Sequence, residues 1–139
     1  MTNQRFDDLT HLTSLVFAQA KQRHSGILAE ENKLRQMLRD LSDQESQAIN
    51  VTSDVQFQKI GADVAWSKWI DQTRLALNIS LAKTLARKES SRQALQASFG
   101  KNEVAKTLEQ NARQKRMKMR ESSQFQTIQA FMTYTVHDR

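Results

Sequence analysis

One column of side chains recurs every seven residues through the first third of this 139-residue chain, and the chain contains no proline. The column comprises Phe6, Thr13, Ala20, Ile27, Leu34, Leu41 and Ala48. Further apolar residues follow it by three or four positions: Leu9, Val16, Phe17, Met37 and Leu38. A seven-residue period keeps such side chains on one side of a helix that packs against another helix. The pattern therefore predicts a helix over about 4–49. The side that packs against the other helix, here called the seam, is weakened by the polar residues His24, Glu31 and Glu45.

The segment "INVTSD" at residues 49–54 interrupts this repeat. Asn, Thr, Ser and Asp favour turns and caps because their side chains hydrogen-bond to nearby backbone groups. Ser53 and Gln56 form a capping-box pattern. We therefore predict a turn over about 50–53 and a second helix over about 54–121. Apolar or small residues recur in this helix at intervals of three or four: Val55, Ala62, Trp66, Trp69, Thr73, Ala76, Leu77, Leu81, Leu85, Leu95 and Phe99.

Together these patterns predict an all-α fold, in which residues 1–121 form a long antiparallel two-helix coiled-coil hairpin with the second helix longer than the first. A turn at 50–53 pairs large residues with small ones, as interdigitated packing requires. The predicted pairs are Ala48/Val55, Leu41/Ala62, Leu38/Ala65, Leu34/Trp69 and Ile27/Ala76. In this register the second helix extends beyond the first from Gly100 onward. Gly100 is then either a hinge or a tolerated glycine, which weakens a helix by about 1 kcal/mol relative to alanine.

Positive charge is concentrated in the second half of the chain. Residues 71–139 contain 13 Lys/Arg and 6 Asp/Glu, whereas residues 1–70 contain 8 and 9. The stretch "ARQKRMKMR", residues 112–120, contains five cations and no acidic residue. At about 100° per residue, residues 104–120 together form a basic amphipathic helix with two distinct sides. Lys106, Arg113, Arg116 and Arg120 lie on one side, and Val104, Leu108, Ala112, Lys115 and Met119 lie on the other.

Three kinds of partner fit so basic a segment. Nucleic acid would be bound through counterion release, but no aromatic residues interleave the cations and no groove-reading module is recognisable. An anionic membrane surface is disfavoured because the apolar side has no Trp or Phe between residues 101 and 120. An acidic, partly apolar protein surface uses both sides, and a solvated helix end without any partner is the remaining alternative. The predicted contact residues are Lys106, Leu108, Ala112, Arg113, Arg116, Met119 and Arg120.

Two further segments hold candidate contact residues. Trp66 and Trp69 are three residues apart, which favours core packing. A two-helix seam covers two indoles poorly, so an exposed anchor for another protein is the alternative. Residues 122–139 place Phe125, Ile128 and Phe131 among Gln and Thr at mixed spacing, and we expect this C-terminal tail to be weakly ordered.

The sequence offers no pattern for catalysis or for a bound cofactor. Its three histidines, His11, His24 and His137, are scattered, and the chain contains no cysteine. No spacing resembles a metal site or a nucleophile with its base, and no glycine-rich phosphate loop is present. No apolar run reaches the roughly 18 residues that a membrane-spanning helix needs. We therefore expect a non-enzymatic protein with no cofactor, no metal and no membrane span.

The stretch "SFGKNEVAKTLEQNARQKRMK", residues 98–118, together with the proline-free and cysteine-free hairpin and its longer basic helix, resembles the flagellar type III export stalk protein family (FliJ-like). The likeness in architecture covers roughly residues 4–121. It implies a cytoplasmic accessory of the export apparatus that inserts into the export ATPase ring and contacts the export gate protein. In some members it also implies escort of export chaperones. None of the family's contact positions aligns residue by residue, so none is transferred.

The resulting hypothesis is a coiled-coil stalk of the flagellar (type III) protein export apparatus that helps to couple the ATPase ring to the gate. Two alternatives remain open at this point. One is a basic helical nucleic-acid-binding protein, and the other is a coiled-coil scaffold unrelated to secretion.

Overall fold

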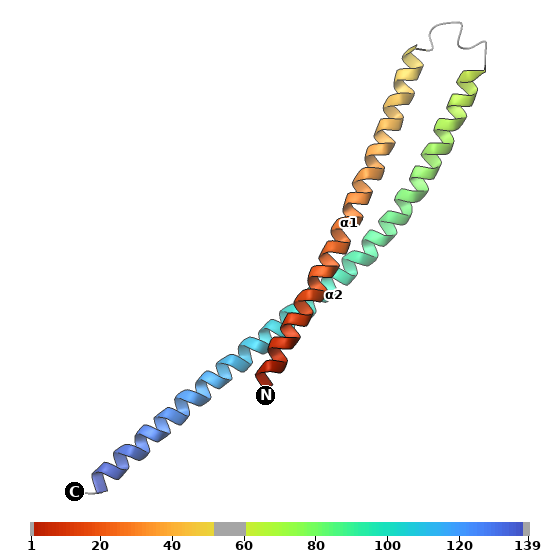
Figure 1. Ribbon diagram of the computed structural model, residues 1–139. Coiled ribbons are helices and arrows are strands. Elements are labelled where there is room, and N and C mark those ends of the chain that lie inside the picture. The colour runs from red at the N-terminus through yellow and green to blue at the C-terminus, as the bar shows by residue number, and fades with distance from the viewer. Residues whose placement is uncertain (1, 52–60, 138–139) are drawn as a thin grey trace. The chain divides into compact units, whose positions relative to one another are not determined.

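Two long helices make up the parts of the chain that the structure describes, which are residues 2–51 and 61–137 of a computed structural model (Figure 1). Helix α1 spans Thr2–Val51 and helix α2 spans Ala62–His137. The helices pack against each other and the second is longer, so the predicted all-α hairpin is confirmed. The chain divides into two compact units, Met1–Gln19 with Gln96–Arg139 (unit 1) and Ala20–Leu95 (unit 2).

Helix α2 begins later than the sequence predicted. Gly61 has a φ of 66°, in the left-handed region that glycine adopts without strain, so a right-handed helix begins only after it. The backbone N–H of Ala65 donates to the Gly61 carbonyl at 3.2 Å. Asp63 accepts from the Val64 N–H at 2.8 Å and places a negative charge at the positive end of the helix. The predicted capping box of Ser53 and Gln56 lies outside the described residues.

The predicted seven-residue column of α1 faces α2. Every one of its members is buried or half-buried, and Ile27 and Leu41 are the most enclosed, at 6% and 5% exposed. The second inward column follows by four residues rather than three, and comprises Thr10, Phe17, His24, Glu31, Leu38 and Glu45. The residues at three positions further on, Leu9, Val16 and Met37, are exposed. The seam of α1 is therefore more polar than its apolar residues alone suggest.

The predicted register of the two helices is wrong. In unit 2, His24 Nδ1 lies 2.7 Å from Ser91 Oγ and Lys88 Nζ lies 2.7 Å from Glu31 Oε2. The predicted register would instead have placed residue 79 opposite His24. Ten residues, not four, separate α1 from α2, and each residue added to a connection shifts the pairing along the second helix. The pairs Leu41/Ala62, Leu38/Ala65, Leu34/Trp69 and Ile27/Ala76 are overturned, and Val55 of the fifth pair lies outside the described residues.

The two helices of unit 1 remain paired well beyond Gly100, where the sequence predicted that the overhang begins. Thr13 Oγ1 donates to Asn102 Oδ1 at 3.2 Å, and the rings of Phe17 and Phe99 lie 5.6 Å apart between centroids. Ala105, at 2% exposed, belongs to the same seam. Gly100 therefore lies within the region where the two helices pair, and not at the end of that region as predicted. Its backbone is helical.

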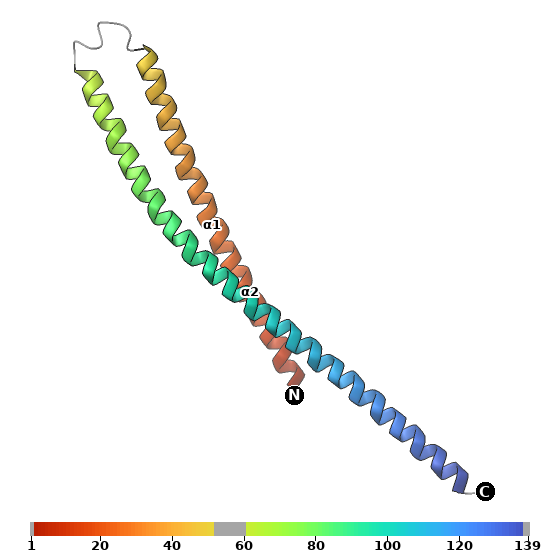
Figure 2. The same ribbon diagram turned by 180° about the vertical axis from the view of Figure 1, so that it is seen from behind.

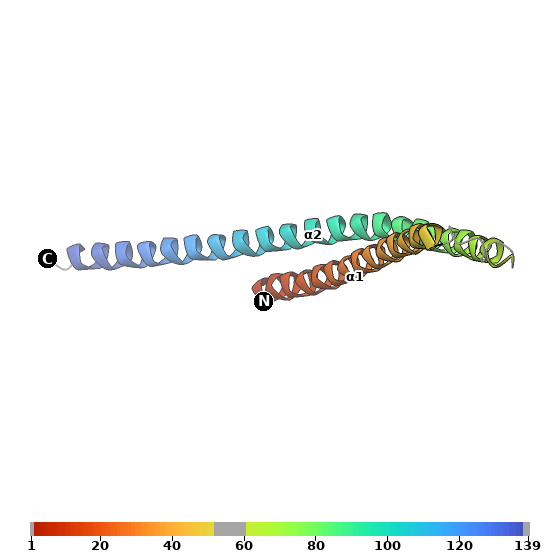
Figure 3. The same ribbon diagram turned by 90° about the horizontal axis from the view of Figure 1, so that it is seen from above.

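Helix α2 continues 16 residues past its predicted end at about 121, to His137. Ala112 is half-buried, and every residue from Arg113 to Tyr134 is exposed. Within unit 1 this part of α2, drawn in blue, extends past the N-terminus of α1 in every view (Figure 1, Figure 2 and Figure 3). The segment 122–137 is helical because it contains neither Gly nor Pro and includes the helix formers Gln, Ala and Met. Its weak order in the isolated protein stays a prediction.

Candidate partner-binding surface

The basic segment 112–120 lies where α1 ceases to cover α2. Arg113 Nη2 lies 3.6 Å from Asp7 Oδ1, and the same guanidinium pairs with Glu109 one turn earlier. The four following cations, Lys115, Arg116, Lys118 and Arg120, form no ion pair with any residue that the structure describes. The predicted arginine face is thus divided, because Arg113 is neutralised within unit 1 while Arg116 and Arg120 present their full charge to solvent.

The other predicted contact residues of unit 1 are divided in the same way. Lys106 pairs with Glu103 at 2.9 Å, one turn away on the same helix. Leu108 and Met119 are exposed, at 41% and 65%, whereas Ala112 is half-buried one heptad after Ala105. The residues available to a partner are therefore Leu108, Arg116, Met119 and Arg120, with Lys115 and Lys118 beside them.

Trp66 and Trp69 are exposed, at 41% and 47%, so the prediction that they pack in the core is wrong. Their rings stack on each other with centroids 5.1 Å apart and an interplanar angle of 29°. The seam position is taken by the next residue, Ile70, which is 1% exposed. The two indoles belong to unit 2, and the basic segment belongs to unit 1. Their exposure agrees with the alternative of an aromatic anchor for another protein.

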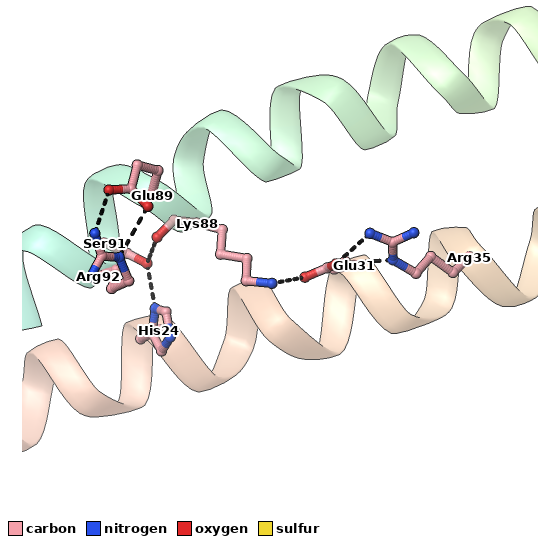
Figure 4. A network of polar contacts seen from close by, with 7 residues as sticks. All are labelled: His24, Glu31, Arg35, Lys88, Glu89, Ser91 and Arg92. Atoms are coloured by element: carbon pink, nitrogen blue, oxygen red, sulfur yellow. Dashed lines mark hydrogen bonds and ion pairs between the residues drawn. The ribbon is translucent and has the colours of Figure 1, made fainter.

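Unit 2 contains a network of charged and polar residues inside its seam (Figure 4). Glu31, 7% exposed, accepts from Lys88 Nζ at 2.7 Å and from Arg35 Nε at 2.9 Å. The hydrogen bond from Lys88, followed by that from Arg35, holds the pKa of Glu31 below its usual value. On α2, the hydrogen bond from Arg92 likewise lowers the pKa of Glu89, and that contact raises the pKa of Arg92.

The contact between His24 and Ser91 has the length of the hydrogen bond between a nucleophile and its base. A general base must accept the proton of the nucleophile. The Ser91 hydroxyl lies 3.0 Å from the backbone carbonyl of Lys88, which is only an acceptor. His24 Nδ1 and Ser91 Oγ share a hydrogen bond of 2.7 Å, and the tautomer of His24 decides which of them donates. The pair is a polar contact across the seam of unit 2.

The described residues contain no group of three or more His, Cys, Asp or Glu side chains placed to hold a metal ion. None of the helices described has a stretch apolar and long enough to cross a membrane.

The surface that sequence reasoning missed is the outward side of the helices. Only four apolar residues are buried in the described chain, whereas 22 large apolar side chains are exposed. On α2 of unit 2 these include Leu75 at 62% and Ile79 at 47%, between the seam positions. The signal was present in the spacing, because Leu75 and Ile79 are out of phase with Ile70, Leu77 and Leu81. The described residues therefore bury little apolar surface and leave much of it exposed.

Comparison with models of protein families, with curated proteins and with solved structures gives no match for this chain.

Proposed function

We propose that this protein is a non-enzymatic docking protein, whose hairpin presents an extended basic helix to an acidic protein surface. The observation that supports this most is the fully exposed part of α2 from Arg113 to Tyr134, with four cations that pair with no described residue. Guanidinium groups at Arg116 and Arg120 recur at i and i+4, so they point to similar sides of the helix and suit bidentate contact with carboxylates. Leu108 and Met119 add apolar area that a protein groove would bury.

The partner that we propose is the ATPase ring of a flagellar (type III) export apparatus, and the proposal of this particular partner rests on the resemblance of residues 98–118 to the export stalk family. In this function the hairpin acts as a stalk within the ring and helps to couple it to the export gate protein, in the cytoplasm. Escort of export chaperones belongs to the same proposal. The exposed indoles of Trp66 and Trp69 are a second contact point on the hairpin.

The test is a binding titration of the export ATPase with charge-reversed variants of the full chain. The variant is Arg116→Glu, Lys118→Glu and Arg120→Glu, and Arg113 is left unchanged because Asp7 and Glu109 already pair with it. The control reverses three cations of unit 2, Lys21→Glu, Lys33→Glu and Lys83→Glu, so that both variants have the same net charge. Circular dichroism of both variants should match the parent, since exposed charges contribute little to folding.

We expect the first variant to weaken ATPase binding by at least about tenfold, with the largest loss in association rate at low salt, because electrostatic steering is strongest there. The control should bind within about twofold of the parent if the segment acts through its position rather than through net charge alone. Equal losses in both variants would show non-specific attraction and would contradict the proposal. Tight, salt-steep binding of the parent to DNA, lost in the first variant while ATPase binding survives, would establish the nucleic-acid alternative instead.

A further inference from the structure

The part of α2 beyond α1 is one uninterrupted helix, and this continuity aligns residues that the sequence appeared to separate. At about 100° per residue, five exposed apolar residues lie within about 60° of the direction of Ile128. They are Met117, Phe125, Ile128, Phe131 and Met132, with exposures from 55% to 72%. From residue 122 to 133 the opposite side of the helix consists mainly of Ser, Gln and Thr, and before residue 121 it carries Lys115 and Met119. A break at 121 would have left Met117 unrelated to the aromatic residues, whereas the observed helix places them in one stripe of about 22 Å at 1.5 Å per residue.

The charged residues of this helix are confined to its first part. The five cations all lie within residues 113–120, and one carboxylate, Glu121, follows them on the apolar side. From Ser122 to Val136 no residue carries a charged side chain. Lys118 and Arg120 lie about 80° to either side of the stripe's centre, one on each flank of Met117. Long cationic side chains at such flanking positions extend their charge to water or phosphate while their stems cover apolar surface.

We propose that residues 113–134 form an interfacial helix that binds the surface of an anionic lipid bilayer, with the stripe of Met117, Phe125, Ile128, Phe131 and Met132 in the acyl boundary. Amphipathic helices of this kind combine an aromatic apolar side with Lys and Arg that attract anionic headgroups. The cations of residues 113–120 include Lys118 and Arg120 on the two flanks of the stripe, where both can reach anionic headgroups while the stripe faces the acyl boundary. The long stretch that follows has no charged side chain up to Val136, so it can lie at the boundary between headgroups and acyl chains without burying a charge.

This inference goes beyond the proposed function and does not depend on an ATPase. It also changes what the sequence indicated, because the membrane alternative was disfavoured by the lack of Trp or Phe between residues 101 and 120. The helix extends past that window, and Phe125 and Phe131 supply the missing aromatic residues in phase with Met117.

The test is co-sedimentation of the full chain with vesicles of pure phosphatidylcholine or of phosphatidylcholine containing 30% phosphatidylglycerol. Two variants separate the contributions of the stripe and of the cations. The first is Phe125→Gln, Ile128→Gln and Phe131→Gln, which keeps every charge. The second is the reversal of Arg116, Lys118 and Arg120 to Glu. The control is Trp69→Gln, Leu75→Gln and Ile79→Gln, which removes three exposed apolar residues of unit 2.

We expect the parent to bind the anionic vesicles and to leave the neutral ones in the supernatant. Each lost cation near a charged surface lowers the binding constant by about fivefold, so the reversal variant should lose at least about a hundredfold. The apolar variant should also lose at least tenfold, while the control binds as the parent does. Absence of binding to anionic vesicles would overturn the proposal, and so would binding that survives the apolar variant, since attraction would then be electrostatic alone.

A spectroscopic measurement tests the location of the stripe independently. In a Trp66→Phe and Trp69→Phe background, Phe131→Trp places the only indole of the chain on the stripe. Its emission should shift to shorter wavelength with anionic vesicles and should be quenched by brominated lipid, as expected for burial about 5–10 Å into the interface. An unshifted, unquenched emission in the vesicle-bound protein would overturn the proposal. Loss of ATPase binding in the apolar variant without any vesicle binding would assign the stripe to a protein groove.

Discussion

Adjacent residues Trp69 and Ile70 provide the sharpest test of how the helices of unit 2 pack. Ile70 is 1% exposed and lies in the seam, whereas Trp69 is 47% exposed and lies outside it. The sequence-based register placed Trp69 opposite Leu34, so in that register the large indole would be the core residue. The structure instead predicts that the smaller side chain matters more. Ile70→Ala should destabilise the hairpin considerably more than Trp69→Ala does.

The magnitudes follow from burial. Truncating Ile70 to Ala removes three buried carbon groups, worth about 0.8 kcal/mol each, and leaves a cavity, so a loss of about 2–4 kcal/mol is expected. Trp69 loses its stacking contact with Trp66, and aromatic pairs contribute about 0.5–1.5 kcal/mol beyond the area they bury. Ala has a higher helix propensity than Trp, which offsets this loss by a few tenths of a kcal/mol. Since Trp69 is 47% exposed, truncation also loses the apolar area that is covered, and the net loss for Trp69→Ala is expected to be about 1–2 kcal/mol, below that of Ile70→Ala.

Urea unfolding followed by circular dichroism at 222 nm measures both losses, with Leu75→Ala, at 62% exposed, as a control that should stay near the parent. The slope of the transition should be unchanged, which would show that the same surface is exposed on unfolding in each variant. A loss for Trp69→Ala that equals or exceeds the loss for Ile70→Ala would refute the observed seam and restore the register in which Trp69 faces Leu34.

Four further predictions concern other parts of the chain. Gly100→Ala should raise the unfolding free energy by about 0.4–1 kcal/mol, because Gly100 is helical and nothing lies within 4 Å of an added Cβ. A lower unfolding free energy in urea would show that this glycine is needed. Thr10→Val should raise the unfolding free energy by about 1 kcal/mol, since the buried Oγ1 of Thr10 has no hydrogen-bond partner among the described residues. A lower urea midpoint in the variant than in the parent would contradict this prediction. Because Lys88 and Arg35 lower the pKa of Glu31 in the fold, its contribution to stability is complete above the ordinary value of 4.5 and is lost as the pH falls through the lowered pKa. Thermal melts of Glu31→Gln should therefore differ from the parent at pH 7, and the difference should shrink as the pH falls below 4.5. Amides of residues 115–134 should exchange with solvent much faster than those of residues 98–109, because a helix without tertiary packing opens readily; equal protection would contradict the exposure of that segment.

The inward side of α1 was predictable from the sequence, because its seven-residue column is mainly apolar. The inward side of α2 was not, because small and polar residues occupy much of it: Thr84, Ser91, Ser98 and Asn102 are all buried. A periodicity argument assumes that apolar residues face the partner helix. Of the residues in the predicted pattern, Leu77, Leu81 and Leu95 are half-buried whereas Trp66, Trp69 and Phe99 are exposed, so the prediction combined residues from two sides of this helix.

The candidate surface was predicted in composition but not in detail. The cations of residues 112–120 are evident from the sequence, and their exposure follows from the second helix being the longer one. The pairing of Arg113 with Asp7 depends on the register, which a wrong connection length had displaced. The sequence prediction placed the end of α2 at about 121, at the start of the polar stretch Glu121 to Gln124. No glycine or proline occurs there to stop the helix, so it continues and brings Phe125 into line with Met117.

The polar residues that seemed to weaken the seam are the ones that define its register. Sliding α2 by one heptad keeps seam positions facing seam positions, so the apolar residues alone distinguish such registers poorly. The same slide would replace Lys88 opposite Glu31 by Leu81 or Leu95, leaving a carboxylate that is 7% exposed without the cation of α2. Glu31 would then keep only Arg35 of its own helix as a partner, and losing one partner of a buried ion pair is unfavourable, so the observed register is favoured over the two neighbouring ones. Scoring His24, Glu31 and Glu45 against Ser91, Lys88 and Arg74 would have found this register from the sequence. A seam specified by polar pairs needs few apolar residues, which leaves the others on the outward faces where partners and lipid can reach them.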